Sequence, residues 1–330
     1  MAGMNIAKVD DHLVRTEVWS SELKEILRDE MMAQKYVRML EGFPDGNTFT
    51  IPTIKTIGTN DYTDDTAVTY DQLDTAEFQF TIDKYLTSAT YITKQSQQDS
   101  WYAGELESRF VPEQARAIME HFETTSLKMG ETAVLAGAGV DSEEVLDGAK
   151  HRYQGSGTGG KIGVKDFAYA RYALKKSKVP DRGLVAIVDP SVEYELSTLS
   201  QLTSVSNNPS WEGIIRDGAT TGMRFIANIY GFDVYTSNML SVVDATTGLT
   251  QADGTAGADL SAGSGIGVAN LFFSSDAATN PFVGAWRQMP EVDYEYNKDY
   301  QRHEYVTSSR YGVKLYRPEG LVTVVTTSVV

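Results

Sequence analysis

The sequence contains no cysteine, and this absence removes several classes of chemistry at once. Without thiols the chain has no disulfide, no thiolate zinc site, no iron–sulfur cluster and no cysteine nucleophile. It also has no apolar run approaching the roughly 18 residues that a membrane-spanning helix needs. Residues 1–11 carry Lys8, Asp10 and Asp11 without an apolar stretch, unlike a signal peptide. We therefore expect a protein that is made and assembled in a cytoplasm-like compartment.

Positive charge and histidine are also scarce. The 330 residues include 29 Lys and Arg against 45 Asp and Glu, a net charge of −16. Polyphosphate and anionic membranes repel such a chain, so we expect no general nucleic-acid or membrane binding. The four histidines lack metal-site spacing: His303-Glu304 begins like a zinc-protease motif, but Thr307 stands where the second histidine must be. We expect no enzyme active site, no cofactor and no metal.

Enough apolar side chains are present for a folded protein. Hydrophobic residues make up 41 % of the chain, a share typical of globular proteins, and its length suggests about two structural units. Residues 1–44 are predicted to form an arm with one helix, because apolar residues recur there at helical spacing. The stripe consists of Trp19, Leu23, Ile26, Leu27, Tyr36, Val37 and Leu40. A surface helix packed on its own domain shows the same spacing.

Residues 45–92 change to the period of two that is typical of β-strands. Phe49 and Ile51 alternate with Thr, and Phe78, Phe80 and Ile82 alternate with Gln and Thr, which predicts two long strands. The segment contains two basic and eight acidic residues, and Asp61, Asp64 and Asp65 cluster between the strands. A two-stranded ribbon buries little of itself, so we expect it to lie on another surface.

A long helix is predicted over Pro112–Leu135, roughly 36 Å in length at about 1.5 Å per residue. A Gly/Ser loop follows at 148–163, where Gly155, Gly157 and Gly160 satisfy G-x-G-x-x-G. The preceding residues are not an apolar strand. Ile162 stands where a phosphate-binding loop has a Ser or Thr hydroxyl. The pattern therefore favours a flexible loop over a nucleotide site.

Residues 150–182 form a basic segment in this acidic chain, with nine basic and two acidic residues and a predicted helix over Lys165–Ser177. One interpretation is that the acidic ribbon of one subunit docks on the basic segment of another, since opposite charges fix register. The candidate contacts are Asp61, Asp64, Asp65, Lys165, Arg171, Lys175 and Lys176. The alternative is that each is only a solvated charged face.

The second half of the chain alternates apolar strands with short helices and loops. The continuous apolar run 184–188 predicts a strand buried on both faces. Further predicted elements are a helix at 191–199, strands at 225–229 and 232–235 that flank a turn at Tyr230-Gly231, strands at 268–274 and 282–286, a core-poor flexible loop at 244–264, a strand around 311–315 and a closing strand at 321–329.

The order of these elements, over essentially the whole chain, resembles the major capsid protein of tailed bacteriophages, which has the Hong Kong ninety-seven type fold. Asn47-Thr48-Phe49-Thr50-Ile51-Pro52 resembles the start of that family's ribbon, the E-loop, and Gln114–Leu135 resembles its spine helix. The other similar stretches are Val185-Ala186-Ile187-Val188-Asp189-Pro190, Tyr230-Gly231-Phe232-Asp233-Val234-Tyr235-Thr236-Ser237-Asn238 and Tyr311-Gly312-Val313-Lys314-Leu315-Tyr316-Arg317-Pro318-Glu319-Gly320.

The resemblance implies an α+β capsid fold in five parts. These are an N-terminal arm (1–44), the E-loop ribbon (45–92), a peripheral domain with the spine helix (93–182), an α/β axial domain (183–285) and return strands of the peripheral domain (286–330). In the arm, Trp19, Leu23 and Leu27 would contact a neighbour.

The implied function is a structural, non-enzymatic coat protein of the virion. Its copies would form hexamers and pentamers that tile an icosahedral shell around double-stranded DNA, assembled in the bacterial cytoplasm. The implied partners are other copies, a separate scaffolding protein, a portal and a decoration protein, with no membrane and no sequence-specific DNA contact. Two alternatives stay open: an encapsulin-like compartment that holds a cargo enzyme, and an acidic enzyme with a β-rich body.

Overall fold

The computed structural model describes residues 31, 33–41, 46, 48–54, 59–68, 75–99, 103–130, 145–198, 225–243, 249–260 and 266–328. All of these belong to one compact unit. The predicted arm contacts Trp19, Leu23 and Leu27 lie outside the described residues. None of the described helices is long and apolar enough to cross a membrane.

A seven-stranded sheet forms the most buried part of the chain. Its order is β7-β15-β12-β8-β10-β9, and β11 pairs with β12. The strands are β7 (Arg152–Gln154), β8 (Leu184–Val188), β9 (Phe225–Ile229), β10 (Phe232–Thr236), β11 (Val242–Val243), β12 (Gly267–Ser274) and β15 (Leu321–Thr327). Every residue of β8 and β12 is buried, as an uninterrupted apolar run predicts.

Buried hydrophobic side chains pack on both faces of this sheet. Ala186, Val188 and Phe272 point to one side and pack with helices α4 (Val164–Lys176) and α5 (Pro190–Thr198). Val185, Ile187, Leu271 and Phe273 point to the other side, where they pack with Tyr36, Phe122 and Tyr311. The alternation of side chains along β8 and β12 therefore joins two cores through one sheet.

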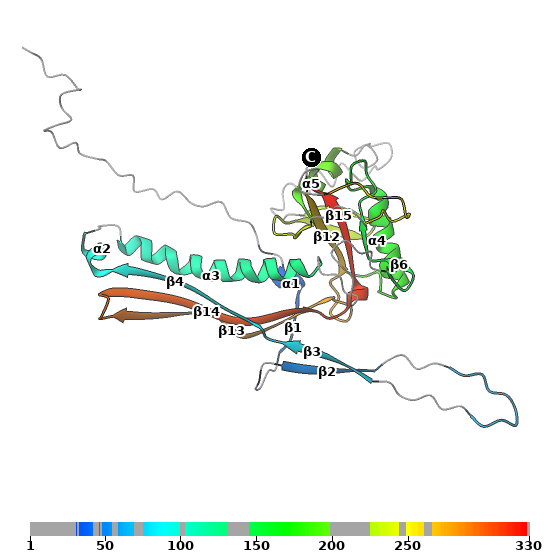
Figure 1. The fold of residues 1–330 in the computed structure, drawn as a ribbon, viewed down its shortest axis with the longest axis horizontal. Helices are drawn as coiled ribbons and strands as arrows, with labels where there is room; N and C mark the ends of the chain where they lie inside the picture. The colour runs from blue at the N-terminus through cyan, green and yellow to red at the C-terminus, as the bar shows by residue number, and fades with distance from the viewer. Residues whose placement is uncertain are drawn as a thin grey trace, which may run out of the picture. The chain divides into compact units, whose positions relative to one another are not determined.

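The second sheet has four strands in the order β1-β13-β14-β4. They are β1 (Arg38–Met39), β4 (Lys84–Thr93), β13 (Phe282–Asn297) and β14 (Arg302–Leu315). Helix α3 (Ala103–Leu127), continued by a 3₁₀ turn η2 (Lys128–Gly130), lies along β4 and β14 (Figure 1). Gln114 bonds Thr90 on β4 (2.7 Å) and Thr307 on β14 (3.0 Å), which identifies the face that α3 covers.

The ribbon consists of β2 (Thr48–Ile54) and β3 (Thr75–Thr81), paired antiparallel. Its root is anchored by Phe80, which is fully buried with Ile82, Val283 and Ala285. Next to it, the ring of Phe78 meets that of Tyr316 edge-on at 4.9 Å. The small remaining elements are α1 (Ala33–Tyr36), α2 (Lys94–Asp99), β5 (Val145–Leu146), β6 (Ala149–Lys150) and the 3₁₀ turn η3 (Pro318–Gly320).

Several sequence predictions are confirmed. The class is α+β, the ribbon is an antiparallel strand pair, and 184–188 is a strand buried on both faces. The helices predicted near 165–177 and 191–199 are α4 and α5. Tyr230 (φ 51°) and Gly231 (φ 87°) form the turn between β9 and β10, since both left-handed positions suit a tight hairpin.

Other predictions are wrong in part. The arm helix does not reach Leu40, because residues 38–39 pair as a strand with β13 and Leu40 N–H donates to the carbonyl of Gly284 (2.8 Å). The long helix begins at Ala103, so Pro112 lies inside it and not at its first turn. Residues 282–286 open the sixteen-residue strand β13, whose second half is too polar and acidic to be recognised as buried strand.

Two predicted loops contain structure that local patterns miss. Residues 149–154 form β6 and β7, and β7 is buried because it adds in parallel to β15, more than 160 residues away. In the predicted core-poor loop 244–264, Leu249 and Leu260 are buried against Val243, Ala269 and Val325. In both segments, burial depends on contacts with strands outside the segment itself.

The sheet pairing also differs from the predicted division of the chain. Strands β7 and β15 belong to the seven-stranded sheet with β8 and β12, whereas the prediction assigned 93–182 and 286–330 to a peripheral domain. The five-part division itself stays a prediction.

Candidate assembly surfaces

The ribbon tip presents three carboxylates. Asp61, Asp64 and Asp65 are exposed, and a turn closed by the 3.3 Å bond from Thr66 N–H to the Thr63 carbonyl holds the last two side by side. Asp65 has φ 64°, a left-handed position that aspartate tolerates in turns. Tyr62 beside them is 66 % exposed. The tip therefore combines acidic groups with an exposed ring, a composition suited to a basic and aromatic partner.

The basic segment is less positive than its sequence suggests. Arg171 Nε lies 2.9 Å from Asp181 Oδ1, and Lys175 Nζ lies 2.8 Å from Asp181 Oδ2. The hydrogen bond from Arg171, followed by that from Lys175, lowers the pKa of Asp181 to about 2. Lys161 likewise pairs with Glu195 at 2.5 Å. Two of the four predicted receptor cations are thus engaged within the chain, while Lys165 and Lys176 are exposed on α4.

The glycine-rich loop is used for packing. The N–H of Gly157 donates to the carbonyl of Lys161 (2.8 Å), and the N–H groups of Ser156 and Gly163 donate to Asp166 Oδ2 (2.9 and 2.7 Å). A phosphate-binding loop needs such donors free to meet its ligand. Burial raises the pKa of Asp166, and the two backbone donors oppose that shift. The loop therefore fixes the start of α4 and offers no phosphate cradle.

The three histidines in the described part of the chain serve packing as well. His303 Nδ1 bonds the hydroxyl of Tyr294 (2.5 Å), and His121 Nδ1 bonds that of Tyr311 (2.7 Å). His151 is buried with Nδ1 3.2 Å from the carbonyl of Ala149 and Nε2 3.2 Å from Ser177 Oγ. Within the described ranges, no group of three or more His, Asp or Glu side chains could hold a metal.

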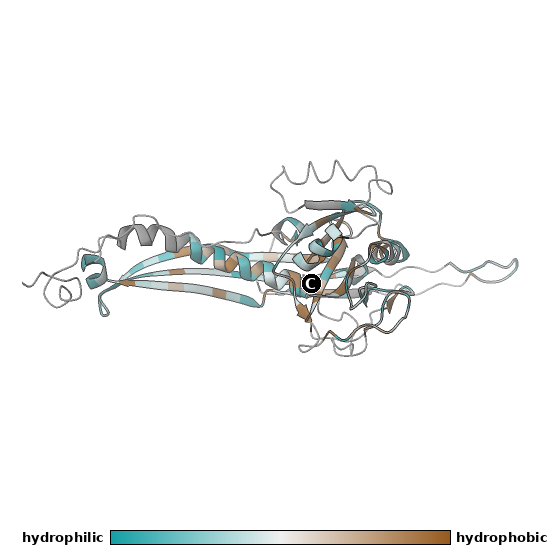
Figure 2. Cartoon of the chain, turned by 90° about the horizontal axis from the view of Figure 1, so that it is seen from above, coloured by the Kyte–Doolittle hydropathy of each residue, from teal (hydrophilic) through white to brown (hydrophobic). Residues whose placement is uncertain are grey.

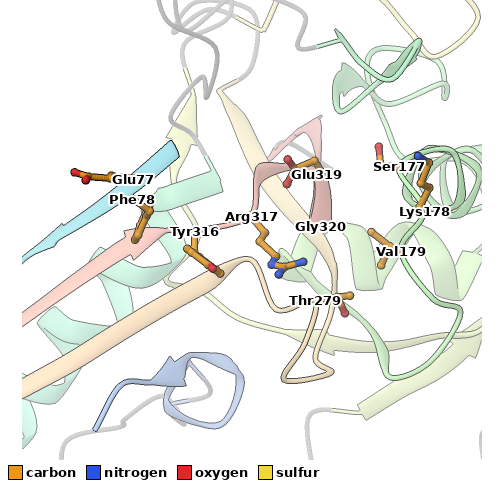
Figure 3. A pocket seen from close by; sticks show the side chains of 10 residues that line it. All are labelled: Glu77, Phe78, Ser177, Lys178, Val179, Thr279, Tyr316, Arg317, Glu319 and Gly320. Atoms are coloured by element: carbon orange, nitrogen blue, oxygen red, sulfur yellow. The ribbon is translucent and has the colours of Figure 1, made fainter. Parts of the chain in front are cut away.

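A polar cleft of about 590 Å³ lies beside the ribbon root (Figure 3). Glu77 and Phe78 of β3 line one side, and the segment that follows α4 lines the other. Figure 3 shows Arg317 between Tyr316 and Thr279, while the carboxylate of Glu77 points away from it. The full lining is Glu77, Phe78, Ser177, Lys178, Val179, Thr279, Tyr316, Arg317, Glu319 and Gly320. Its mixed charges match no single class of ligand.

The face of the four-stranded sheet opposite α3 is the surface that the sequence interpretation missed. The register pairs Tyr85 with Arg310 and Tyr91 with Glu304, and both rings belong to the face that α3 does not cover. Tyr85 is 64 % exposed and Tyr91 59 % exposed. In Figure 2 the long strands of this sheet are mostly pale or teal, whereas brown segments concentrate in the seven-stranded sheet. The period-two pattern of β4, with tyrosines at its ends, is a signal that could have revealed this face.

This open face has a tyrosine and an arginine at each end, Tyr85 with Arg310 and Tyr91 with Arg302. Arg302 lies beyond Tyr91 at the hairpin end, and its guanidinium is 4.5 Å from the ring centre of Tyr91 and 4.7 Å from that of Tyr300. These two residue types are enriched at the energetic centres of protein interfaces. On the far strand β13, the same face carries Glu291, Asp293 and Glu295. The open face therefore has an aromatic, basic half and an acidic edge.

Comparisons with known proteins give one consistent result. A family model described as "Phage capsid protein" matches residues 75–324. The structure titled "Cyanophage Pam1 capsid asymmetric unit" superposes with a TM-score of 0.66 at 17 % identity, covering 99 % of both chains. A chain of Mycobacterium phage Che8 gives 0.65 at 18 % identity, covering 94 % of this chain and 96 % of that one.

A third solved structure is titled "Asymmetric unit of bacteriophage PhiM1 mature capsid". It gives a TM-score of 0.63 at 11 % identity and covers 99 % of this chain and 100 % of that chain. A comparison with curated proteins finds no match. At these identities the structures establish a shared fold, of the Hong Kong ninety-seven type.

Proposed function

This chain belongs to the phage capsid protein family, and from that premise we propose that it is the major capsid protein of a tailed bacteriophage. Its copies associate as hexamers and pentamers into an icosahedral shell around double-stranded DNA. The role is structural and the site of action is the virion capsid. Assembly takes place in the host cytoplasm with a separate scaffolding protein, a portal and a decoration protein.

One observation carries the proposal beyond the family match. A single copy leaves two extended surfaces exposed: the ribbon tip around Asp64 and the Tyr–Arg half of the four-stranded sheet. An isolated two-stranded ribbon is marginal in water, and a half-covered sheet exposes apolar rings that contact with another subunit would bury. Self-association accounts for both surfaces, and the structures titled as capsids support it.

The direct test is electron microscopy and sedimentation velocity of the full chain purified from cells that express it. Closed shells, or rings of five and six subunits, are the expected result. Particles from infected cells that contain DNA support a phage coat, while particles that contain an enzyme would establish the encapsulin-like alternative. A monomer at every protein and salt concentration would contradict assembly as the function.

Within this proposal the acidic ribbon tip docks on a positively charged surface of another copy. The variant Asp61→Lys, Asp64→Lys and Asp65→Lys reverses the tip charge without touching a core. We expect fewer shells and dissociation at lower salt or temperature. The matched variant with asparagine at the same three positions removes the charge without reversing it and should give an intermediate effect. Shells of unchanged yield and salt resistance from the lysine variant would show that the tip does not dock through its charge.

A further inference from the structure

The end of the β13–β14 hairpin holds one arginine in a fixed pose. The guanidinium of Arg302 lies over the rings of both Tyr91 and Tyr300, 4.5 and 4.7 Å from their centres. Contact with both rings attracts the cation and restricts the freedom of its side chain. An exposed arginine normally loses much side-chain conformational entropy on binding. Because the fold already restricts the side chain of Arg302, less entropy would be lost when it binds a partner.

The turn that carries Tyr300 is itself constrained. Asn297 Oδ1 accepts the N–H groups of Asp299 (3.1 Å) and Tyr300 (3.4 Å). The side-chain amide of Gln301 donates to the carbonyl of Lys298 (2.8 Å) and accepts the hydroxyl of Tyr296 (2.8 Å). These bonds fix the position of the ring that covers Arg302. The hairpin end is therefore a preorganised surface.

One edge of the guanidinium is left for a partner. Arg302 Nε donates to Glu304 Oε1 at 2.6 Å. Neither Nη group has a hydrogen-bond partner among the described residues. A guanidinium has five N–H donors in one plane, and two parallel donors match the two oxygens of a carboxylate. The rings of Tyr91 and Tyr300 cover part of the guanidinium, and the two Nη groups remain as a pair of donors for a carboxylate.

We infer that Arg302 is the receptor for an aspartate of the ribbon tip, Asp64 or Asp65, of a second copy of this chain. The inference deepens the proposed function and depends on it, because it names where the tip of one copy binds another. Charge complementarity supports this occupant, since the tip presents exposed carboxylates next to the exposed ring of Tyr62.

The Tyr–Arg strip has dimensions that suit a ribbon. Tyr85 pairs with Arg310 near one end of β4, and Tyr91 lies six residues along the same strand, about 20 Å away at about 3.4 Å per residue. Thr87 and Ala89 between them are small and exposed. A strand of seven residues such as β2 spans a similar length. A ribbon lying along the strip would therefore cross the small residues and reach an arginine.

The acidic groups nearby do not exclude a carboxylate partner. Glu304 is already engaged by Arg302 and by Asn297 Nδ2 (3.2 Å). Glu291, Asp293 and Glu295 lie on β13, which is separated from β4 by β14. Lys94 follows the end of β4 and its backbone N–H bonds the carbonyl of Gln301. In the turn itself, the charge of Asp299 is offset by that of the neighbouring Lys298.

The competing receptor is the basic surface on α4. Arg171 there bonds Asp181 through both Nε and Nη2 and the carbonyl of Tyr230 through Nη1, whereas Arg302 is paired with Glu304 through Nε alone. Lys175 also pairs with Asp181, and Lys165 and Lys176 are exposed on the helix. Lysine also lacks the planar pair of donors. The structure therefore favours Arg302, and the two α4 lysines provide a control in which the change of charge is twice as large.

The test compares shell formation by Arg302→Glu with that by Lys165→Glu plus Lys176→Glu, in the full chain. We expect the single change at Arg302 to lower shell yield and salt resistance at least tenfold more than the double change on α4. Arg302→Lys keeps the charge but loses the two-pronged bond and should be intermediate. Thermal unfolding of each unassembled variant checks folding, and Arg302→Lys replaces Arg302→Glu if the latter does not fold.

A charge exchange identifies the partner. Arg302→Glu combined with Asp64→Arg and Asp65→Arg should recover part of the lost yield, whereas either set of changes alone should not. Wild-type-like shells from both Arg302 variants would overturn the inference, and so would a larger loss from the α4 variant. In both cases wild-type shells would still support the proposed function. No shells from the wild type would overturn the proposed function itself.

Discussion

The two main sheets differ in how completely one copy covers them. The seven-stranded sheet has core on both faces, with Ala186 and Val188 packed to one side and Val185 and Ile187 to the other. The four-stranded sheet has α3 on one face; on the other, the ribbon root covers Val283 and Ala285, and the tyrosines of β4 are exposed. The first sheet is a folding core within one chain, and the second is half of a core that a neighbour would complete.

The residue types of the strands explain this difference between the two sheets. Strands β8 and β12 are nearly continuous apolar runs, whereas β4 alternates and β13 becomes acidic beyond Trp286. Even the covered face of the four-stranded sheet is partly polar, with Gln114 and Thr307 bonded where a core would have leucine. Stability of the monomer and stability of the shell should therefore respond to different substitutions.

The largest expected loss of unfolding free energy comes from a substitution in the seven-stranded sheet, which is covered on both faces. Phe272 is fully buried, with its ring edge-on to Phe167 (5.1 Å) and Phe232 (5.3 Å). Phe272→Ala should destabilise the unassembled chain by about 4 kcal/mol, as large-to-small core changes do. Tyr85→Ala on the open face should cost about 0.5 kcal/mol or less. Urea unfolding of both variants checks this, and similar losses would contradict the comparison.

The next largest loss of unfolding free energy is expected at Asp166, the buried carboxylate that fixes the start of α4. Asp166→Ala removes the acceptor of the Ser156 and Gly163 N–H groups. We expect a loss of about 2–3 kcal/mol from two unsatisfied donors, and a smaller loss for Asp166→Asn, which keeps an acceptor. Denaturant midpoints measure both. If Asp166→Asn is as destabilising as Asp166→Ala, the hydrogen bonds are not what matters.

Acid should weaken the same region through His151. Burial lowers the pKa of His151 from 6.5, although the carbonyls of Ala149 and Glu319 oppose the shift. The unfolded chain then binds a proton more readily than the folded one, so stability is full above about 6.5 and declines as the pH falls below it. Thermal unfolding across this range should show a smaller decline for His151→Gln. A steeper or equal decline would contradict this assignment.

The smallest effect is expected at the exposed ion pairs of α4. The side chain of Asp181 is 30 % exposed, and its pKa is lowered to about 2 by Arg171 and Lys175. Because solvent screens it, Asp181→Asn should cost less than about 1 kcal/mol at neutral pH. The wild-type advantage is present above pH 3.8 and is lost as the pH falls toward 2. Melting curves at low and high salt test this, since salt should shrink the difference.

The sequence predicted those parts of the fold whose signals are local. The apolar run 184–188, the ribbon strands and the turn at Tyr230-Gly231 each depend on neighbouring residues. Strand β7 and the buried Leu249 depend on partners distant in the chain, so periodicity could not reveal them.

The candidate assembly surfaces were also predicted only where the signal is local. The carboxylates of Asp61, Asp64 and Asp65 were evident from composition, and all three are exposed. Charge counting overstated the basic segment, because it could not show that Asp181 holds Arg171 and Lys175. It also missed Arg302, whose position depends on rings from two segments about 200 residues apart.

We expect a second copy of the chain to complete the half-covered sheet. Hydrogen exchange of the backbone amides of 85–91 and 302–310, in the unassembled chain and in purified shells, tests it directly. These segments and the ribbon tip at 61–65 should gain protection on assembly, while the fully buried strand 184–188 should change little. Unchanged exchange in 85–91 and 302–310 within closed shells would show that no second copy covers the open face.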